Sequence, residues 1–305
     1  TVDEYKDAKE VILITGQLSF TKSGAKSSIF ERLRKEKSVQ HLYNFSNNPK
    51  FYELIDALNK ISTKNVDLIV AVGGGTILDY SKLIKCFMHS NSVQVSNEIE
   101  HDNRSIKIKD IPLIVIPSTA GSGSEATQFA VIYKDNVKHS VSNKNLLPNF
   151  IIHDTELPLS NSKEQKISQG LDTFAQAIES YWAVNSDAKA KAYSAKASEL
   201  VMNNFLLFAR GSNAKAIVKN MQLASYFSGK AINIAKTTAP HAWSYYLSSH
   251  LDVSHGIAVW YTLPKVFDIH MDSKNFREGM KPSIHKKNMK QLSKLIGLNE
   301  TKPSN

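Results

Sequence analysis

Short apolar runs alternate with amphipathic stretches through the first half of the chain. The apolar runs place hydrophobic residues at consecutive positions, which is typical of strands buried on both faces of a parallel sheet. We predict strands in these runs and helices in the stretches of helical spacing between them. The predicted strands cover residues 11–16, 39–45, 67–72, 111–117 and part of 146–158, and the predicted helices cover 24–35, 49–61 and a stretch after Gly75. The polar residues 90–110 are predicted to form a loop.

The pattern changes in the second half, where the strand signals end and apolar residues recur at helical spacing. The helices predicted there cover residues 164–184, 187–209, 213–233 and 239–250. We therefore predict an α/β plus all-α protein, with a Rossmann-like parallel-sheet domain at residues 1–157 and an all-helical domain at residues 158–305. The length agrees with two domains, because single hydrophobic cores stop growing at about 250–300 residues.

The composition is that of a water-soluble globular protein, with 42% hydrophobic and 22% charged residues. No apolar run reaches the ~18 residues that a membrane span needs, and the N-terminal residues are too polar for a signal peptide. The single cysteine, Cys86, rules out an internal disulfide and is expected to be buried on a helix. We expect a cytoplasmic protein with no membrane partner.

The formal net charge of +10 allows nucleic acid, an anionic membrane or an anionic small molecule as a partner. The lysines are spread along the chain among Asp and Glu, and no dense basic tract with interleaved aromatic residues is present. This distribution argues against nucleic acid and membranes. It leaves an anionic substrate, or simple solubility, as the reason for the charge.

Two glycine-rich turns follow consecutive predicted strands. Gly73, Gly74 and Gly75 follow the third strand, and the segment 118–125 follows the fourth with hydroxyl side chains and two further glycines. Glycines allow the backbone to approach a pyrophosphate closely, and the next helix N-terminus attracts its negative charge. Neither turn matches the Gly-x-Gly-x-x-Gly fingerprint, and a lone glycine triplet can be just a tight turn. Their combination at one edge of the sheet predicts nucleotide or phosphate binding.

A candidate metal site lies in the predicted helical domain. Asp172 and Gln176 are four residues apart and so share one face of a helix, while His241 and His255 follow later in the chain. One Asp and two His are the three protein ligands that a catalytic zinc or ferrous site uses when it leaves a position open for substrate. From spacing alone, an ordinary buried aspartate and two unrelated histidines remain the alternative.

The combined motifs resemble the iron-containing (group III) alcohol dehydrogenases. The residues that carry the resemblance are the segment 73–82 (GGGTILDYSK), the segment 117–125 (PSTAGSGSE), the helix with Asp172, and the pair His241 and His255. The resemblance implies a dinucleotide-binding domain and a helical domain of the dehydroquinate synthase-like fold, with metal and substrate in the cleft between them. It also implies one divalent metal (Fe²⁺ or Zn²⁺), NAD(H) or NADP(H) as cofactor, and a homodimer.

The same resemblance assigns roles by position. It implies metal ligation by Asp172, His241 and His255, with Gln176 as a weaker fourth donor. It implies cofactor binding by Gly73, Gly74, Gly75, Thr76, Asp79, Ser118, Thr119, Ser122 and Ser124. Asp79 has a second explanation, because an acid in the first turns of a helix also stabilises the helix dipole.

This chain departs from the usual family pattern at several positions. Gln176 replaces a histidine, which is similar to the zinc-using glycerol dehydrogenase branch and puts iron in doubt. Tyr245 stands where many members have another histidine, and either relays a proton or packs. Tyr43 and Asn44 stand where NAD-dependent relatives carry an acid for the adenosine ribose, which leaves NADPH open. An N-terminal segment and several C-terminal helices of usual members are expected to be absent from this chain.

A narrower resemblance concerns the substrate. Segments 172–186 and 229–241 resemble the phosphonoacetaldehyde reductase branch, which reduces that aldehyde to 2-hydroxyethylphosphonate. A phosphonate needs fixed cations and neutral donors, which Lys230, Asn233 and Lys236 would supply; the alternative is two solvated helix lysines. Competing functions are a dehydrogenase of small neutral alcohols or polyols, a dehydroquinate-synthase-like lyase, and a basic binding protein without activity.

Overall fold

The computed structural model describes residues 5–62, 65–101, 108–272 and 281–298. The chain divides into two compact units. The first, which we call the sheet unit, comprises Thr1–Thr119 and Ser124–Asn161. The second, the helical unit, comprises Ala120–Gly123 and Ser162–Asn305, so a short segment of the second glycine-rich turn belongs to it.

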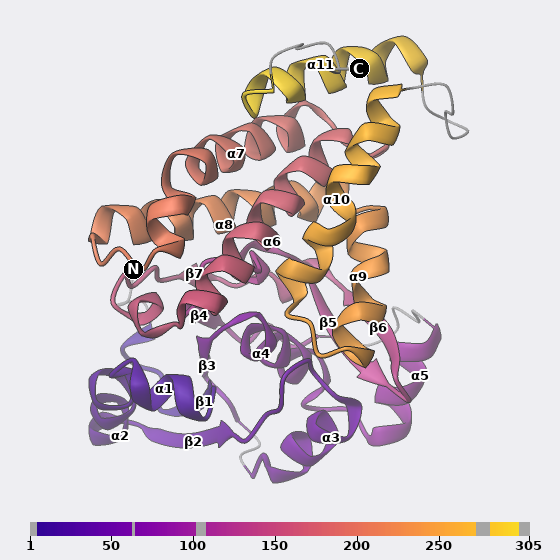
Figure 1. The fold of residues 1–305 in the computed structure, drawn as a ribbon. Coiled ribbons are helices and arrows are strands. Elements are labelled where there is room, and N and C mark those ends of the chain that lie inside the picture. The colour runs from indigo at the N-terminus through magenta and orange to yellow at the C-terminus, as the bar shows by residue number, and fades with distance from the viewer. Residues whose placement is uncertain (1–4, 63–64, 102–107, 273–280, 299–305) are drawn as a thin grey trace. The chain divides into compact units, whose positions relative to one another are not determined.

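A five-stranded parallel sheet forms the centre of the sheet unit, as predicted (Figure 1). Its order is β2-β1-β3-β4-β7, with all four pairings parallel. The strands are β1 Glu10–Thr15, β2 Ser38–Tyr43, β3 Leu68–Gly73, β4 Leu113–Pro117 and β7 Phe150–Ile151. Alternate residues of the central strands enter two separate hydrophobic cores: Ile12 and Ile69 belong to one, and Leu13 and Val70 to the other. Both faces of the sheet are therefore buried, which explains the continuous apolar runs in the sequence.

The helices of the sheet unit differ in places from the prediction. They are α1 Leu18–Lys22, a π-helical turn Lys26–Phe30, α2 Glu31–Glu36, α3 Phe51–Lys60, α4 Gly75–Phe87 and α5 Ser92–His101. The stretch predicted as a loop at 90–110 contains α5, so that prediction was wrong. Val95 and Ile99, one turn apart, are the buried positions of α5, and these two residues gave too weak a periodic signal because the third apolar residue, Val93, is exposed. Cys86 is buried in α4, as predicted.

A β-hairpin that the sequence analysis did not identify lies between β4 and β7 in the chain. Its strands are β5 Phe129–Lys134 and β6 Val137–Ser142, which pair antiparallel. Asp135 and Asn136 form the two-residue turn with φ of 51° and 62°. These are the left-handed values that two-residue hairpin turns favour and that Asp and Asn tolerate.

The helical unit consists of long helices, as predicted (Figure 1). They are α6 Lys163–Trp182, α7 Ala188–Ala209, α8 Lys215–Ala235, α9 Ala239–His250, α10 His255–Asp272 and α11 Pro282–Leu295. The first four match the predicted ranges closely. The predicted all-helical domain includes α10 and α11, but no separate range was predicted for either; α10 contains Pro264, and four of the 14 residues of α11 are lysine. Among the described residues, no helix is both long and apolar enough to cross a bilayer.

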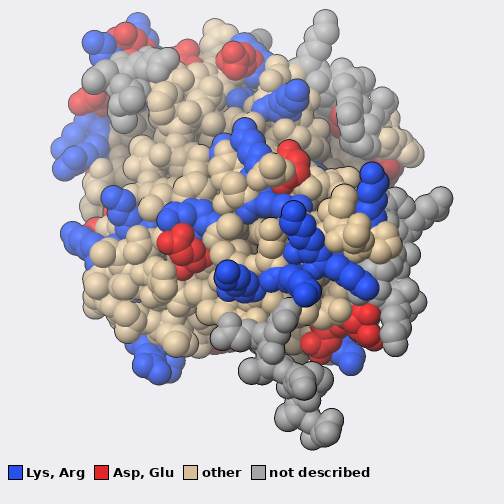
Figure 2. All heavy atoms as spheres, turned by 90° about the horizontal axis from the view of Figure 1, so that it is seen from above, with Lys and Arg blue, Asp and Glu red and all other residues tan. Residues whose placement is uncertain are grey.

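Basic side chains gather on the face of the protein seen from above in Figure 2. Helix α11, which lies at the top of Figure 1, contributes several lysines and contains neither Asp nor Glu. Its exposed lysines are Lys286, Lys287, Lys290 and Lys294. The formal charge of +10 is thus carried in part by a hydrated helix surface.

A histidine pair joins α10 to α11 and makes the stability of the helical unit depend on pH. His270 Nδ1 lies 3.1 Å from His285 Nε2, and the His270 ring stacks on Trp182 with centroids 4.6 Å apart. Burial, with the nearby His285, lowers the pKa of His270 to about 4, against a smaller opposing effect of Glu179. His270 therefore binds more protons in the unfolded chain than in the folded chain between pH 6.5 and about 4.

We accordingly expect the free energy of unfolding to fall as pH falls through this window. His270→Gln keeps hydrogen-bonding groups but does not titrate. Between pH 7.5 and pH 5, its free energy of unfolding should fall by about 1 kcal/mol less than that of the wild type, allowing for solvent screening. Urea unfolding curves at the two pH values measure the difference. Parallel pH dependence in the two proteins would show that His270 is not responsible.

Candidate metal centre

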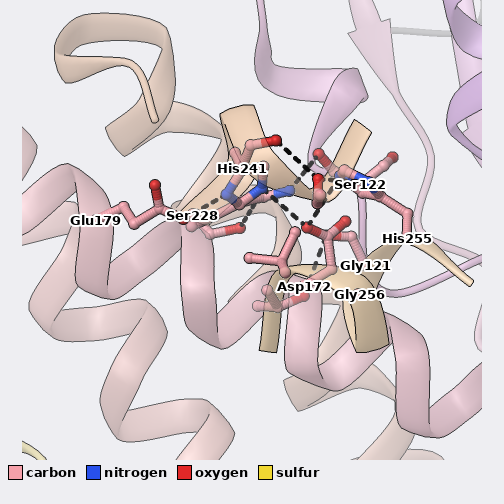
Figure 3. Close-up of polar contacts among 12 residues, drawn as sticks. Gly121, Ser122, Asp172, Glu179, Ser228, His241, His255 and Gly256 are labelled. Atoms are coloured by element: carbon pink, nitrogen blue, oxygen red, sulfur yellow. Dashed lines mark hydrogen bonds and ion pairs between the residues drawn. The ribbon is translucent and has the colours of Figure 1, made fainter. Parts of the chain in front are cut away.

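Three predicted ligands meet inside the helical unit. Asp172 of α6 and His241 of α9 are buried, and His255 at the start of α10 is half-buried. His241 Nε2 lies 3.2 Å from Asp172 Oδ1, and His255 Nε2 lies 3.8 Å from the same oxygen (Figure 3). Over the described residues, this is the single group of three or more His, Cys, Asp or Glu whose candidate ligand atoms converge, within 4.8 Å of one another. One carboxylate and two imidazoles suit a divalent metal such as Fe²⁺ or Zn²⁺, so the donor set fits the expected group.

A close backbone contact brings His255 to Asp172. Gly256 follows His255 at the start of α10, and its amide donates to Ser168 Oγ at 3.1 Å. A Cβ atom on Gly256 would lie 1.9 Å from the Ser168 carbonyl oxygen and 3.0 Å from the Asp172 amide nitrogen. Because only glycine fits there, α10 can begin directly against the backbone of α6.

His241 is held by a carboxylate that the sequence analysis did not identify. Glu179, fully buried on α6, accepts hydrogen bonds from His241 Nδ1, from the Thr238 amide at 2.5 Å and from Thr238 Oγ1 at 2.8 Å. A signal was available, because Glu179 lies seven residues after Asp172 and therefore on the same face of α6. His255 has a weaker neighbour, since its Nδ1 lies 3.5 Å from Ser244 Oγ.

The charges of the cluster suit a cation. Burial alone would raise the pKa of the Asp172 carboxyl, but the charge of His255 and the hydrogen bond from His241 hold it below the ordinary value. Burial alone would lower the pKa of His241, but the Glu179 charge and the bonds to Asp172 and Glu179 raise it to about 9. Two buried carboxylates therefore attract positive charge, which a divalent ion supplies on displacing the imidazole proton.

Gln176, the predicted weaker fourth donor, is engaged by other groups. Its Nε2 donates to the Ser122 carbonyl at 3.2 Å, and its Oε1 accepts from Ser228 Oγ at 2.8 Å. Ser122 is held near α8 because Gly123 and Gly229 touch through their backbones: a Cβ atom on Gly229 would lie 2.2 Å from the Gly123 carbonyl oxygen. The predicted metal ligation by Gln176 stays a prediction.

The other predicted residues of the helical unit lie at varied positions around this centre. The Tyr245 ring is nearly parallel to that of His255, with centroids 6.4 Å apart. Lys236 caps the C-terminus of α8 with φ 67° and ψ 174°. Asn233 is half-buried near the end of the same helix. Lys230 lies over the Tyr226 ring, with Nζ 5.5 Å from its centroid. Lys230 is two residues after Ser228, which is about 200° around the helix from the side chain that contacts Gln176.

The two glycine-rich turns lie side by side at the carboxyl ends of β3 and β4. The Ser118 amide donates to the Gly73 carbonyl at 2.9 Å, and a Cβ atom on Gly74 would lie 3.1 Å from the Thr119 side chain. Helix α4 begins at Gly75, directly after β3. Thr76 Oγ1 lies 3.4 Å from the Asn48 amide. A helix N-terminus at the carboxyl edge of a parallel sheet is the arrangement that binds phosphate groups in this fold class.

Asp79 holds Ser124 in place. Its Oδ1 accepts from Ser124 Oγ at 2.6 Å and its Oδ2 from the Val131 amide at 3.0 Å. The buried Lys82 ammonium donates to the Ser124 carbonyl at 2.6 Å and to Thr127 Oγ1 at 2.9 Å. In this structure Asp79 therefore braces the second glycine-rich turn, and its predicted contact with the cofactor stays a prediction, as does that of Ser124.

Sequence comparison matches both halves of the chain to one family. Residues 1–155 match the model for "Iron-containing alcohol dehydrogenase", and residues 166–305 match "Fe-containing alcohol dehydrogenase family, C-terminal". The chain belongs to the iron-containing alcohol dehydrogenase family. The narrower phosphonoacetaldehyde reductase branch is not distinguished by these matches.

Individual relatives agree with the family assignment. The chain is 29% identical to long-chain-alcohol dehydrogenase 1 of Geobacillus thermodenitrificans over 85% of its own length and 66% of the relative's. It is 30% identical to 1,3-propanediol dehydrogenase of Citrobacter freundii over 85% of its own length and 67% of the relative's. A crystal structure of sulfoacetaldehyde reductase from Bifidobacterium kashiwanohense in complex with NAD⁺ has the same fold, with a TM-score of 0.80 at 24% identity, over 98% of this chain and 81% of that one. The chain thus spans about two thirds of these curated relatives.

Proposed function

We propose that the protein is a metal-dependent NAD(P)H oxidoreductase that reduces a small aldehyde to a primary alcohol. The observation that carries the proposal is the convergence of Asp172, His241 and His255 within 4.8 Å inside a member of the iron-containing alcohol dehydrogenase family. A divalent metal bound there would act as a Lewis acid on the carbonyl oxygen, and a nicotinamide would supply the hydride.

Residues of the helical unit would bind the metal, and residues of the sheet unit would bind the cofactor. Asp172, His241 and His255 would hold the metal and leave a position open for substrate. The turn at Gly73–Gly75 and the N-terminus of α4 would bind the cofactor pyrophosphate. The expected homodimer and the choice between NADH and NADPH stay predictions.

For the substrate we propose a small anionic aldehyde, with phosphonoacetaldehyde as the specific candidate. Lys236 supports this, because its φ of 67° and ψ of 174° lie in a region that glycine almost alone adopts, at a cost on the order of 1–3 kcal/mol. Such strain is typical of functional sites, and Lys236 lies five residues before His241, so we assign its positive charge to binding the anionic group of the substrate. The fold is shared with a protein named as a reductase of another anionic aldehyde, sulfoacetaldehyde.

The second candidate function is a dehydrogenase of neutral alcohols, which the names of the curated relatives favour. Family membership supports either dehydrogenase over the lyase considered from sequence. The two dehydrogenase functions differ in one property, because only an anionic substrate gains from a fixed cation.

The test compares phosphonoacetaldehyde with propionaldehyde in the metal-reconstituted protein at low salt, following oxidation of NADH and of NADPH. We expect a preference for the phosphonate, and Lys236→Ala should raise its KM by about 10- to 100-fold while changing that of propionaldehyde little. Lys236→Arg is the control that keeps the charge, and Lys236→Gly the control that relieves the backbone without it. Equal effects of Lys236→Ala on both aldehydes would leave the neutral-alcohol function as the better explanation.

A further inference from the structure

The buried carboxylate of Glu179 joins α6 to the start of α9, next to a Trp182 ring that reaches α10. It lies on α6, and its hydrogen-bond donors within the described part of the chain lie at the start of α9: the Thr238 amide, Thr238 Oγ1 and His241 Nδ1. Thr238 Oγ1 in turn accepts from Trp182 Nε1 at 3.0 Å, one turn further along α6. Trp182 also stacks on His270 of α10.

Three donors satisfy a group that would otherwise be costly to bury. Glu179 has no exposed surface, and a desolvated carboxylate is tolerated only when it is hydrogen-bonded or paired. Thr238 is the N-cap residue of α9, and Glu179 of α6 accepts from its backbone amide, as the glutamate of a capping box does within one helix. The carboxylate therefore sets the position of the first turn of α9, where His241 lies.

The contact also determines which nitrogen of His241 is available. Because Glu179 accepts from Nδ1, the proton of the neutral ring lies on Nδ1 and the lone pair lies on Nε2. Nε2 is the nitrogen that faces Asp172, at 3.2 Å (Figure 3). The second imidazole, that of His255, has Nδ1 3.5 Å from Ser244 Oγ, and its side chain is 40% exposed.

We propose that Glu179 is a positioning residue of the metal centre: it fixes the tautomer and orientation of His241 so that Nε2 is the ligand atom, and Thr238 and Trp182 hold its carboxylate in place. The proposal rests on the metal centre proposed above. Mutation of a carboxylate that accepts a hydrogen bond from a ligating histidine typically lowers metal affinity by about 10- to 100-fold.

The test is Glu179→Gln, which preserves size but places an amide where a carboxylate was. If the Gln oxygen accepts from the Thr238 amide, its NH₂ group faces Nδ1 and favours the wrong tautomer of His241. We expect the affinity for Zn²⁺, measured by competition with a chromophoric chelator, to fall about 10- to 100-fold. Long-range ¹⁵N–¹H spectra of the Zn²⁺-loaded wild type should show His241 protonated on Nδ1. Glu199→Gln, which changes an exposed glutamate of α7, is the matched control and should bind like the wild type.

A second variant covers the case in which Glu179→Gln does not fold. Thr238→Val removes one donor to Glu179 but leaves the His241 contact, and it should lower Zn²⁺ affinity by a few-fold, whereas Thr238→Ser should not. Thermal melting of the metal-free variants separates lost affinity from lost folding.

The outcomes distinguish this proposal from the one on which it rests. A folded Glu179→Gln protein with wild-type Zn²⁺ affinity would overturn the positioning role and leave the metal centre standing. If Glu179→Gln does not fold, a Thr238→Val protein with wild-type Zn²⁺ affinity would likewise overturn the positioning role. A wild-type protein that retains no Zn²⁺ or Fe²⁺ would remove the metal centre, and the positioning role with it.

Discussion

Asp172→Ala is expected to abolish metal retention and aldehyde turnover together. Asp172 Oδ1 is the atom on which both imidazoles converge, at 3.2 and 3.8 Å, and it is the single carboxylate among the three candidate ligands. Its loss would leave two neighbouring neutral donors, too few to hold a divalent ion in a catalytic site. Because the Lewis acid contributes several kcal/mol to the transition state, kcat/KM should fall at least ~1000-fold.

The measurements are metal content after dialysis and kcat/KM with the preferred aldehyde. Asp268→Ala, which removes an exposed aspartate of α10, is the control and should retain both properties. An Asp172→Ala protein with metal and turnover intact would exclude Asp172 from the centre. Turnover lost with metal retained would instead indicate that Asp172 acts on the substrate.

Gly256→Ala is expected to damage the same centre without touching a ligand. The new methyl group would meet the Ser168 carbonyl at 1.9 Å, and two backbones cannot both stay where they are. Helix α10 would have to move away from α6 and take His255 with it. We expect a loss of roughly 2–4 kcal/mol in the free energy of unfolding, at the upper end for overpacking, and Zn²⁺ affinity reduced by at least about tenfold.

Denaturant unfolding and chelator competition measure these two effects. Ser254→Ala, two residues earlier, is the matched control, because the buried Ser254 hydroxyl has no hydrogen-bond partner among the described residues and its removal should be neutral. Normal stability in Gly256→Ala would mean that the close approach of α10 to α6 is not present in solution.

The sequence predicted the parts of the fold that depend on local pattern. The runs at 67–72 and 111–117 are apolar on both faces because β3 and β4 are central strands between two cores. The hairpin β5–β6 was missed although residues 129–133 of β5 form an apolar run, because β6 mixes polar with apolar residues and gave no signal for a partner strand. No separate range was predicted for helix α10, which contains Pro264.

The candidate site could be predicted only in part, for a physical reason. Asp172, His241 and His255 are separated by up to 83 positions, so their convergence depends on long-range packing of α6, α9 and α10 that spacing cannot show; the family resemblance supplied it. Glu179 could be placed on the same helix face as Asp172 from its spacing, but spacing does not reveal its contact with His241. Its burial depends on α9 packing across it.

The structure shows which groups Gln176 and Lys230 contact without testing the roles predicted for them. The Gln176 oxygen accepts from Ser228 Oγ at 2.8 Å, and since an amide oxygen has two lone pairs, metal ligation by Gln176 stays a prediction. Lys230 Nζ lies over the ring of Tyr226 on its own helix, and its role in binding an anionic substrate stays a prediction. Both residues were chosen from sequence position, which does not reveal side-chain direction.

X-ray absorption spectroscopy of the Zn²⁺-loaded protein would test the central claim most directly. We expect one zinc per chain, bound by two imidazole nitrogens and a carboxylate oxygen at about 2.0–2.2 Å, with further light atoms from solvent. In His255→Ala one imidazole should disappear from the spectrum. A first shell of oxygens alone, or binding well below one equivalent, would contradict a metal centre formed by Asp172, His241 and His255.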